Sequence, residues 1–400
     1  LYEATFATFF NEQMENKDYI DNVYLYVNII DDAGGNANHH IEYSDKVGPF
    51  TFSKNESNIN FDNGLHLIAP PFSTNYSLEN LFGNPAYHCS NGCSILDEAY
   101  SGLGFYVESD GTSPGITFIA DNNDILSEYS ISINEGWNLI GNPLVEPIDV
   151  NIIMIDFQNI SYDWFEAAKA GIISPTPIIY NNEKVRHEGT DELQTAAGFW
   201  VKSFYDNVEI SFIPYCTEIC DDEGNCSKPE DCEVDYKSEP YDSKYWNLSL
   251  FAKEATEGAD DLKSIGSEIV IGINEEANDS FVQGEDQEIL PLDLLNIDAL
   301  DRYTQLSIDN ANYDGESMIY RDIRSYHDTS ITWNVNIDLV NPFDLSNGIE
   351  LSWLFRGNDE PYDYFLKDGY GNEINMNDPV YNLEDDLYGL IVDNNNLDID

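Results

Sequence analysis

Short runs of alternating apolar and polar residues recur along most of the chain, and Gly, Pro, Asn and Asp separate them. A period of two predicts half-buried β-strands joined by turns. Near the beginning of the chain, two such runs cover residues 3–10 (EATFATFF) and 22–30 (NVYLYVNII). The pattern therefore predicts an all-β chain.

An internal repeat is the most informative part of this pattern. Each copy has a Gly-entered strand, a variable loop, a strand with adjacent aromatic residues and a final alternating strand. The matching segments are 62–72 with 134–144, 101–110 with 196–206, and 115–120 with 209–214. The offset grows from 72 (134 − 62) to 94 (209 − 115), so the second copy carries an insertion of about 22 residues (94 − 72). This insertion contains a helix-like segment, FEAAKAGI.

We expect each copy to form a β-sandwich module, because sandwiches tolerate loops of variable length. Aromatic residues at alternating strand positions are expected to fill one face of the sandwich. The first module is predicted at residues 1–120 and the second at 121–214, either separate or packed together as one unit. A stretch rich in Cys, Asp and Pro predicts a connector at 215–243.

The strand pattern starts afresh after the connector and predicts an independent C-terminal β-sandwich over residues 244–400. A long acidic loop interrupts it at 275–301. The seven alternating runs are 246–252, 266–273, 303–308, 331–339, 348–355, 363–368 and 387–393. The expected fold is therefore a series of immunoglobulin-like or jelly-roll-like β-sandwiches with a short Cys-rich connector.

The charge of the chain restricts its partners. Seventy-five Asp and Glu against 17 Lys and Arg give a formal net charge of −58. Nucleic acid and anionic lipid both require a basic surface, so we expect neither as a partner. No apolar stretch approaches the length of a transmembrane helix, and no membrane span is expected. An acidic surface attracts cations, which suits a high-salt habitat or a Ca²⁺-loaded extracellular protein.

Six cysteines lie in two clusters, a pattern that favours local disulfides in an exported chain. Zinc knuckles are the alternative, but the spacings do not match paired CxxC motifs. The clusters are Cys89 with Cys93, and Cys216, Cys220, Cys226 and Cys232. We therefore expect an extracellular or cell-surface location after export.

Several of these segments resemble β-sandwich modules of secreted and cell-surface proteins of Bacteroidota, of the kind exported by the type IX secretion route. The similar segments are GWNLIGNP (136–143), AGFWV (197–201), the strand that begins at Trp246, the IGI-x₃-A-x-D-x-F stretch (271–281), the Trp333 strand, LSW (351–353) and the turn at 366–376. The resemblance covers modules alone, without the sorting domain of such proteins. It implies sandwich modules and export, and implies nothing about catalysis.

Acidic and amide residues on loops are candidate Ca²⁺ ligands, because Ca²⁺ takes six to eight hard oxygen ligands in a flexible geometry. Solvated acidic turns are the alternative for any one loop, and no loop has EF-hand spacing. The candidates are Asp31, Asp32, Asn36, Asp121, Asp124, Asp221, Asp222, Asp368 and Asn372. No other cofactor is expected.

The aromatic residues suggest one candidate contact. Five of the six tryptophans lie in strand patterns and are expected in cores, whereas Trp164 lies in the insertion and is the better candidate for an exposed binding contact. The histidines are scattered, and we expect them at the surface. The segment GTSPG (111–115) has the G-x-S-x-G spacing but leads into a predicted strand rather than a helix, so it is no nucleophile elbow, and H-E-x-x-H does not occur. No enzyme activity is therefore expected.

Serial sandwiches without a catalytic signature favour an extracellular structural protein, a subunit of a filament, sheath or layer that self-associates. In this hypothesis the strand at 3–10 is donated to an open sheet edge of a neighbour. The first alternative is a cell-surface adhesin or glycan-binding protein. The second is a non-catalytic part of a secreted hydrolase.

Overall fold

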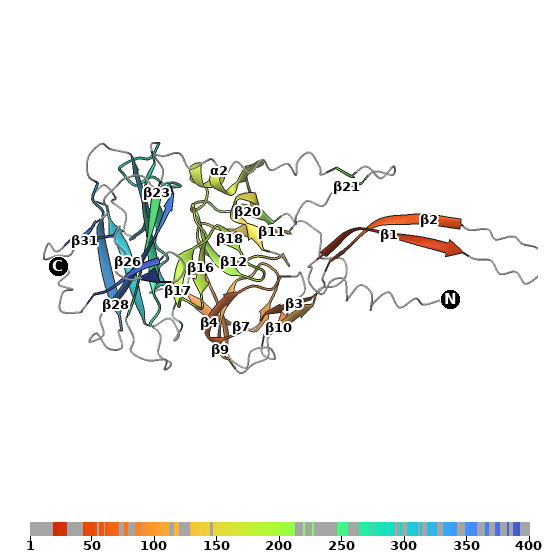
Figure 1. The fold of residues 1–400 in the computed structure, drawn as a ribbon, viewed down its shortest axis with the longest axis horizontal. Helices are drawn as coiled ribbons and strands as arrows, with labels where there is room; N and C mark the ends of the chain where they lie inside the picture. The colour runs from red at the N-terminus through yellow and green to blue at the C-terminus, as the bar shows by residue number, and fades with distance from the viewer. Residues whose placement is uncertain are drawn as a thin grey trace, which may run out of the picture.

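The computed structural model is nearly all β, as predicted. Figure 1 shows three regions in a row: a two-stranded ribbon, the repeat region and a C-terminal sheet. The structure describes residues 19–29, 43–53, 56–59, 61–71, 76–78, 85–90, 92–111, 116–119, 129–144, 147–212, 219–220, 226–227, 246–254, 264–274, 276–292, 295, 297, 302–310, 313, 318–325, 331–341, 349–357, 365–367, 373–376, 382–383 and 387–392.

The two copies of the repeat fold with the same topology, which confirms the repeat. Each builds a four-stranded antiparallel sheet, in the order β4-β9-β6-β7 in copy 1 and β12-β19-β16-β17 in copy 2. Copy 1 contains β3 (Glu56–Ile59), β4 (Asn63–Ile68), β5 (Tyr76–Ser77), β6 (Ala86–Cys89), β7 (Cys93–Leu96), β8 (Glu98–Ala99), β9 (Phe105–Asp110) and β10 (Ile116–Ile119). Copy 2 contains β11 (Tyr129–Ile133), β12 (Gly136–Gly141), β13 (Ile148–Asp149), β16 (Ile178–Asn181), β17 (Arg186–Gly189), β18 (Glu192–Leu193), β19 (Gly198–Ser203) and β20 (Val208–Phe212). The pairs β3–β10, β5–β8, β11–β20 and β13–β18 correspond as well.

The insertion in copy 2 adds a short 3-10 helix (Val150–Ile152), β14 (Met154–Phe157), β15 (Ile160–Asp163) and α2 (Trp164–Lys169). β14 and β15 extend the outer pair to a sheet in the order β11-β20-β14-β15. Asp163 caps α2, since its Oδ1 accepts a hydrogen bond of 2.7 Å from the backbone N–H of Glu166. The insertion therefore completes the second sheet that covers copy 2.

The paired aromatic residues of the repeat are adjacent in their strands and therefore lie on opposite faces, so the prediction made for alternating positions does not describe them. In β9, Phe105, Tyr106 and Val107 are all fully buried, and consecutive strand residues point to opposite faces. In β19, Phe199 packs into the core of copy 2, whereas Trp200 packs into a cluster shared with copy 1. The continuous apolar runs therefore reflect central strands that are covered on both faces.

The two copies join through reciprocal contacts, so that each contact has a counterpart at the equivalent positions. Ile68 bridges Ala197, and its repeat equivalent Ile140 bridges Leu103. The glycine that begins each aromatic strand lies against the backbone of the other copy. A Cβ at Gly104 would lie 2.5 Å from the Ile140 carbonyl oxygen. This close approach explains why Gly precedes the aromatic pair in both copies.

The C-terminal region forms one curled nine-stranded sheet in the order β28-β26-β27-β24-β23-β29-β33-β32, with β25 paired to β27. All seven predicted runs contain strands, but β27 was not predicted. The strands are β23 (Trp246–Glu254), β24 (Ser267–Asn274), β25 (Gln287–Glu288), β26 (Tyr303–Asp309), β27 (Ile319–Ser325), β28 (Asn334–Val340), β29 (Ile349–Gly357), β30 (Phe365–Lys367), β31 (Glu373–Asn375), β32 (Asn382–Leu383) and β33 (Leu387–Val392). β30 and β31 form a separate pair, and β24 pairs with β27 in parallel.

The repeat region and the C-terminal sheet share a hydrophobic cluster. Tyr106 of copy 1 and Trp200 of copy 2 lie in it together with Tyr303 of β26. The segment predicted as a long acidic loop also contributes buried side chains to it, namely Leu290, Leu292, Leu295 and Ile297. The domain boundaries at residues 120, 214 and 243 stay predictions, but residues of both copies and of the C-terminal sheet share one core cluster.

Candidate functional site

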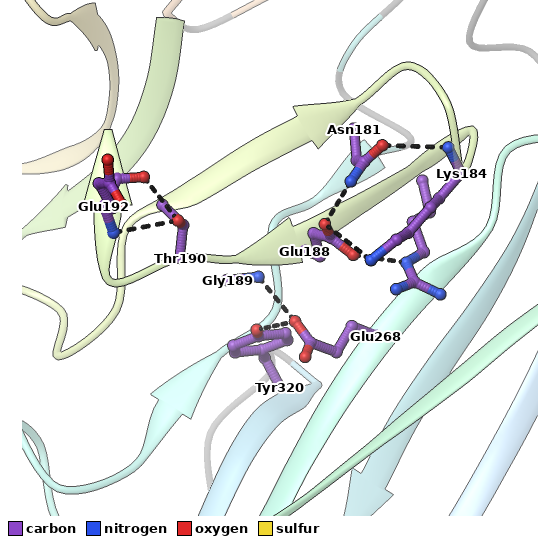
Figure 2. Close-up of polar contacts among 9 residues, drawn as sticks. Asn181, Lys184, Glu188, Gly189, Thr190, Glu192, Glu268 and Tyr320 are labelled. Atoms are coloured by element: carbon purple, nitrogen blue, oxygen red, sulfur yellow. Dashed lines mark hydrogen bonds and ion pairs between the residues drawn. The ribbon is translucent and has the colours of Figure 1, made fainter. Parts of the chain in front are cut away.

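The junction between copy 2 and the C-terminal sheet contains a buried carboxyl group, Glu268 of β24. Its Oε2 accepts hydrogen bonds from the Gly189 backbone N–H at 2.6 Å and from the Tyr320 hydroxyl at 2.5 Å. Figure 2 shows Glu268 and Tyr320 turned toward Gly189 at the end of β17. Burial raises the pKa of Glu268 above its usual value, although these donors oppose the shift. Glu268 thus links two regions that are far apart in the sequence.

A second polar group lies on the same hairpin of copy 2 (Figure 2). Glu188 accepts a charge-assisted hydrogen bond of 2.6 Å from Arg186 Nε and one of 2.6 Å from the Asn181 side chain. The Arg186 guanidinium also lies 3.5 Å from the ring centroid of Phe251 in β23. Arg186 is therefore neutralised by its own strand and held by an aromatic ring of the neighbouring sheet.

Backbone and amide groups extend this junction. The Gln287 amide pairs with both backbone groups of Thr176: its Oε1 accepts from the N–H and its Nε2 donates to the carbonyl, each at 3.1 Å. Lys202 of β19 forms an ion pair of 2.5 Å with Glu288. Directional contacts of this kind fix the relative orientation of two parts better than apolar contacts do. These contacts are typical of two parts that hold one fixed relative orientation, here copy 2 and the C-terminal sheet.

Another buried chain of hydrogen bonds lies between the two copies. Trp200 Nε1 donates to the Tyr106 hydroxyl, which is 2.8 Å from His187 Nε2. The direction of the bond between Tyr106 and His187 depends on the His187 tautomer. Burial lowers the pKa of His187 to about 3, which keeps the ring neutral. The expectation of surface histidines is therefore wrong for His187, which is 5% exposed.

Two buried aspartates lie inside the C-terminal sheet. Asp286 accepts from the backbone N–H groups of Val282 and Ile323, at 2.7 and 2.8 Å. Asp322 accepts from the Asn310 side chain at 3.0 Å and from Arg324 Nε at 2.8 Å. Burial raises the pKa of Asp286 to about 7, and the negative charge of Asp322 adds to this shift. The bond between Ile323 and Asp286 attaches the 282–286 turn to β27.

The predicted exposed contact at Trp164 is wrong. Trp164 is 1% exposed, and its Nε1 donates to the Pro175 carbonyl at 3.0 Å. As the first residue of α2, its ring packs near Phe199 in the core of copy 2. The next residue, Phe165, is 66% exposed instead. The insertion therefore does present an aromatic residue, one position later than predicted.

The predicted disulfide between Cys89 and Cys93 is confirmed, and it closes the β6–β7 hairpin. Cys220 and Cys226 are direct partners in the backbone pairing of β21 (Ile219–Cys220) with β22 (Cys226–Ser227). Cys216 and Cys232 lie outside the described residues, and the disulfides of this cluster stay predictions.

All of the predicted calcium ligands lie outside the residues that the structure describes, and so does the strand predicted at 3–10. The ligands are Asp31, Asp32, Asn36, Asp121, Asp124, Asp221, Asp222, Asp368 and Asn372. Among the described residues, no group of three or more His, Cys, Asp and Glu could hold a metal ion. The calcium sites stay predictions.

The N-terminal ribbon is a two-stranded element separate from the other described sheets. β1 (Tyr19–Ile29) and β2 (Tyr43–Ser53) pair antiparallel, and no other described strand joins them. The ribbon extends from the repeat region on the side opposite the C-terminal sheet (Figure 1). Its two outer edges carry backbone groups that an added strand could pair with. These edges make the ribbon the candidate interaction site.

Comparison with known proteins adds no family to this description. The chain matches no family model, no curated protein and no solved structure. In the described part of the chain, no helix is long and apolar enough to cross a membrane.

Sequence reasoning missed the buried polar residues of the junction, above all Glu268, Tyr320 and Asp286. One signal was present for Glu268, because it interrupts an otherwise apolar run in β24 (SEIVIGI). A charged residue inside a buried strand indicates a partner from another segment. No local pattern identifies that partner, since Gly189 is 79 residues away.

Proposed function

We propose that this protein is a self-associating structural subunit of an extracellular assembly. The observation that carries the proposal is the projecting β1–β2 ribbon, which has two open edges and no third strand among the described residues. A two-stranded ribbon is marginally stable in water by itself. Pairing with another chain would supply the strands that the ribbon lacks.

The sequence of β1 supports a buried destination for the ribbon. Residues 23–27 read Val-Tyr-Leu-Tyr-Val without a polar interruption. A run of this kind in a sequence is typical of a strand that is covered on both faces. A strand with two apolar faces suits the interior of an assembly rather than a solvated tip.

The charge of the chain sets the conditions for assembly. Copies with a net charge of −58 repel one another at low ionic strength. Assembly is therefore expected to need salt or Ca²⁺, with Ca²⁺ held by the acidic loops predicted from the sequence. Added EDTA should loosen any assembly that depends on Ca²⁺.

The extracellular location is part of the proposal. The Cys89–Cys93 disulfide supports it, because disulfides persist in oxidising compartments. The resemblance to exported modules of Bacteroidota supports export by the type IX route.

The test is negative-stain electron microscopy of the full chain in millimolar Ca²⁺ and again after EDTA. Two truncations serve as a matched pair: removal of residues 1–12 deletes the first predicted strand, and removal of residues 1–53 also deletes the ribbon. In this proposal the ribbon takes the donor role that the sequence analysis gave to the strand at 3–10. We therefore expect fibres or sheets from the full chain and from the shorter truncation, and separate particles from the longer one. Loss of assembly in the shorter truncation would instead support donation of the strand at 3–10. Circular dichroism checks that both truncations fold.

Separate particles of the full chain in every condition would overturn the proposal. Binding to a glycan array without self-association would then support the adhesin alternative. Assembly that survives removal of residues 1–53 would leave a structural subunit whose contacts lie outside the ribbon.

A further inference from the structure

The C-terminal sheet ends in a long open edge. β28 is the last strand on one side of the sheet and pairs with β26 over its full length, from Tyr303↔Val340 to Asp309↔Asn334. No other described strand pairs with its outer edge. At the other end of the sheet, β32 spans two residues. β28, with seven residues, therefore presents the longer row of backbone donors and acceptors.

The core beneath β28 is incompletely covered. Val335, Ile337 and Leu339 of β28 pack against the core of the C-terminal sheet but are only half-buried. Leu306 and Ile308, in the neighbouring strand β26, are 0% and 3% exposed. One further strand beside β28 would cover this row as β28 covers β26, and burial of apolar area would stabilise the added strand.

β28 also lacks the usual protection of an exposed edge. Proteins block such edges with Pro, Lys or clustered charge. β28 (NVNIDLV) contains neither Pro nor Lys, and Asp338 is its single charged residue. β1 (YIDNVYLYVNI) likewise has one charged residue, Asp21. In a chain of net charge −58, these two strands can meet with little repulsion.

A ribbon that pairs with this edge must come from another chain. The β1–β2 ribbon and β28 lie at opposite ends of the molecule (Figure 1), so the ribbon does not cover the β28 of its own chain. β1 and β2 each have 11 residues, long enough to pair along all of β28. A contact between two different surfaces of identical subunits repeats without closure and generates a filament when the rotation does not close a ring.

We propose that β28 is the acceptor edge to which the β1–β2 ribbon of a second copy of this chain adds as the next strand. This inference rests on the proposed function and names the surface that it uses. It predicts a head-to-tail contact, with backbone hydrogen bonds between an N-terminal ribbon and a C-terminal sheet.

The test mixes two full-length variants, one with Tyr24→Cys in β1 and one with Asn336→Cys in β28, and treats them with a short bis-maleimide under assembly conditions. Asn336 is exposed, so this change leaves the core intact. The control acceptor is Ser132→Cys, an exposed position in β11, which also ends its sheet. We expect about tenfold more crosslinked dimer with Asn336→Cys than with Ser132→Cys, because an interface raises the effective concentration of its own groups.

Hydrogen exchange of the unmodified chain provides the second measurement. We expect slower amide exchange at residues 334–340 in the assembly than in dispersed chains, with no change in β11. Assembly without protection or crosslinking at β28 would overturn this inference and leave the proposed function intact. Absence of any assembly would overturn both.

Discussion

The two copies of the repeat have the same strand order and yet meet different neighbours. Across the sheet, Trp200 of copy 2 pairs with Ile178, which pairs with Gly189. In copy 1 the same path leads from Tyr106 through Tyr87 to Ile95. Gly189 donates to Glu268 of the C-terminal sheet, whereas Ile95 is 63% exposed. At this equivalent position, copy 2 has Gly in a strand that contacts the C-terminal sheet, whereas copy 1 has Ile in a strand with an open edge.

The neighbouring equivalent positions differ in the same way. Cys89 and Cys93 of copy 1 correspond to Tyr180 and His187 of copy 2, whose rings lie 5.1 Å apart. A disulfide closes the hairpin of the first copy and an aromatic contact takes its place in the second, while Cys89 and Tyr180 both lie in the shared core. The comparison teaches that topology is set by the repeated pattern, while side-chain size at the edge selects the neighbour.

The largest loss of stability is expected when Gly189 of copy 2 is replaced by Ile, the residue at the equivalent position of copy 1. A Cβ at position 189 would lie 2.6 Å from Thr176 Cγ2 and 2.7 Å from the Tyr320 hydroxyl. Gly189→Ile should lower the free energy of unfolding by about 3 kcal/mol or more, through overpacking and loss of the Glu268 hydrogen bonds. Urea unfolding measures the loss. The reverse change, Ile95→Gly, is the control and should cost less than about 1 kcal/mol. Equal effects of the two changes would contradict the comparison.

The next effect concerns the contact between the copies. Gly141 and Ala69 are equivalent positions, and a Cβ at 141 would lie 2.0 Å from Ala69 Cβ. Gly141→Ala should therefore cost about 2 kcal/mol. Adding Ala69→Gly removes the clash and should recover at least half of this loss in a double-mutant cycle. Additive losses in the double variant would show that the reciprocal contact does not couple the copies.

A smaller effect is expected at the hydrogen-bond chain between the copies. Tyr106→Phe leaves Trp200 Nε1 and His187 Nε2 without their present partner in a buried site. The expected loss is about 1–2 kcal/mol in thermal or urea unfolding, the cost of unsatisfied buried polar groups. Tyr205→Phe, at a position 44% exposed, is the matched control and should change stability by less than about 0.5 kcal/mol. Equal stabilities of the two variants would show that these hydrogen bonds do not stabilise the fold.

The smallest effect is expected from pH. It tests the stability of the C-terminal sheet, which copy 2 contacts. Asp286 has a pKa raised to about 7 by burial, so the folded state holds its proton more tightly than the unfolded state, where the carboxyl pKa is about 4. Its contribution is therefore present below pH about 4 and is lost as pH rises through about 7. Asp286→Asn should flatten this part of a stability–pH curve, and Asp338→Asn, at an exposed position, should not. An unchanged slope in Asp286→Asn would contradict the raised pKa.

Much of the strand content was predictable, because alternation is a local property of the sequence. The repeat was visible for the same reason, since Gly and the aromatic residues recur at fixed offsets. β27 was missed because Arg321, Asp322 and Arg324 break the apolar pattern of IYRDIRS. Asp322 and Arg324 are paired with each other, and Asp322 also accepts from Asn310, so this strand lies inside the sheet in spite of its charges.

The candidate sites were less predictable than the strands. Trp164 looked exposed because it lies in the insertion, outside the strand patterns, yet α2 turns its ring into the core and leaves Phe165 outside. His187 looked like a surface residue, but its ring is buried against Tyr106 of copy 1 and Tyr180. Both errors have one cause: exposure depends on what another segment covers.

Local pattern was sufficient for the all-β class, the repeat, its insertion and the Cys89–Cys93 disulfide, because each is encoded within short stretches of chain. Tertiary structure decided that the central strands are buried on both faces and that Glu268 reaches Gly189. It also decided which copy docks the C-terminal sheet and which sheet edge stays open. These features depend on contacts between segments far apart in the sequence, and local alternation specifies the faces of a strand without specifying what covers them.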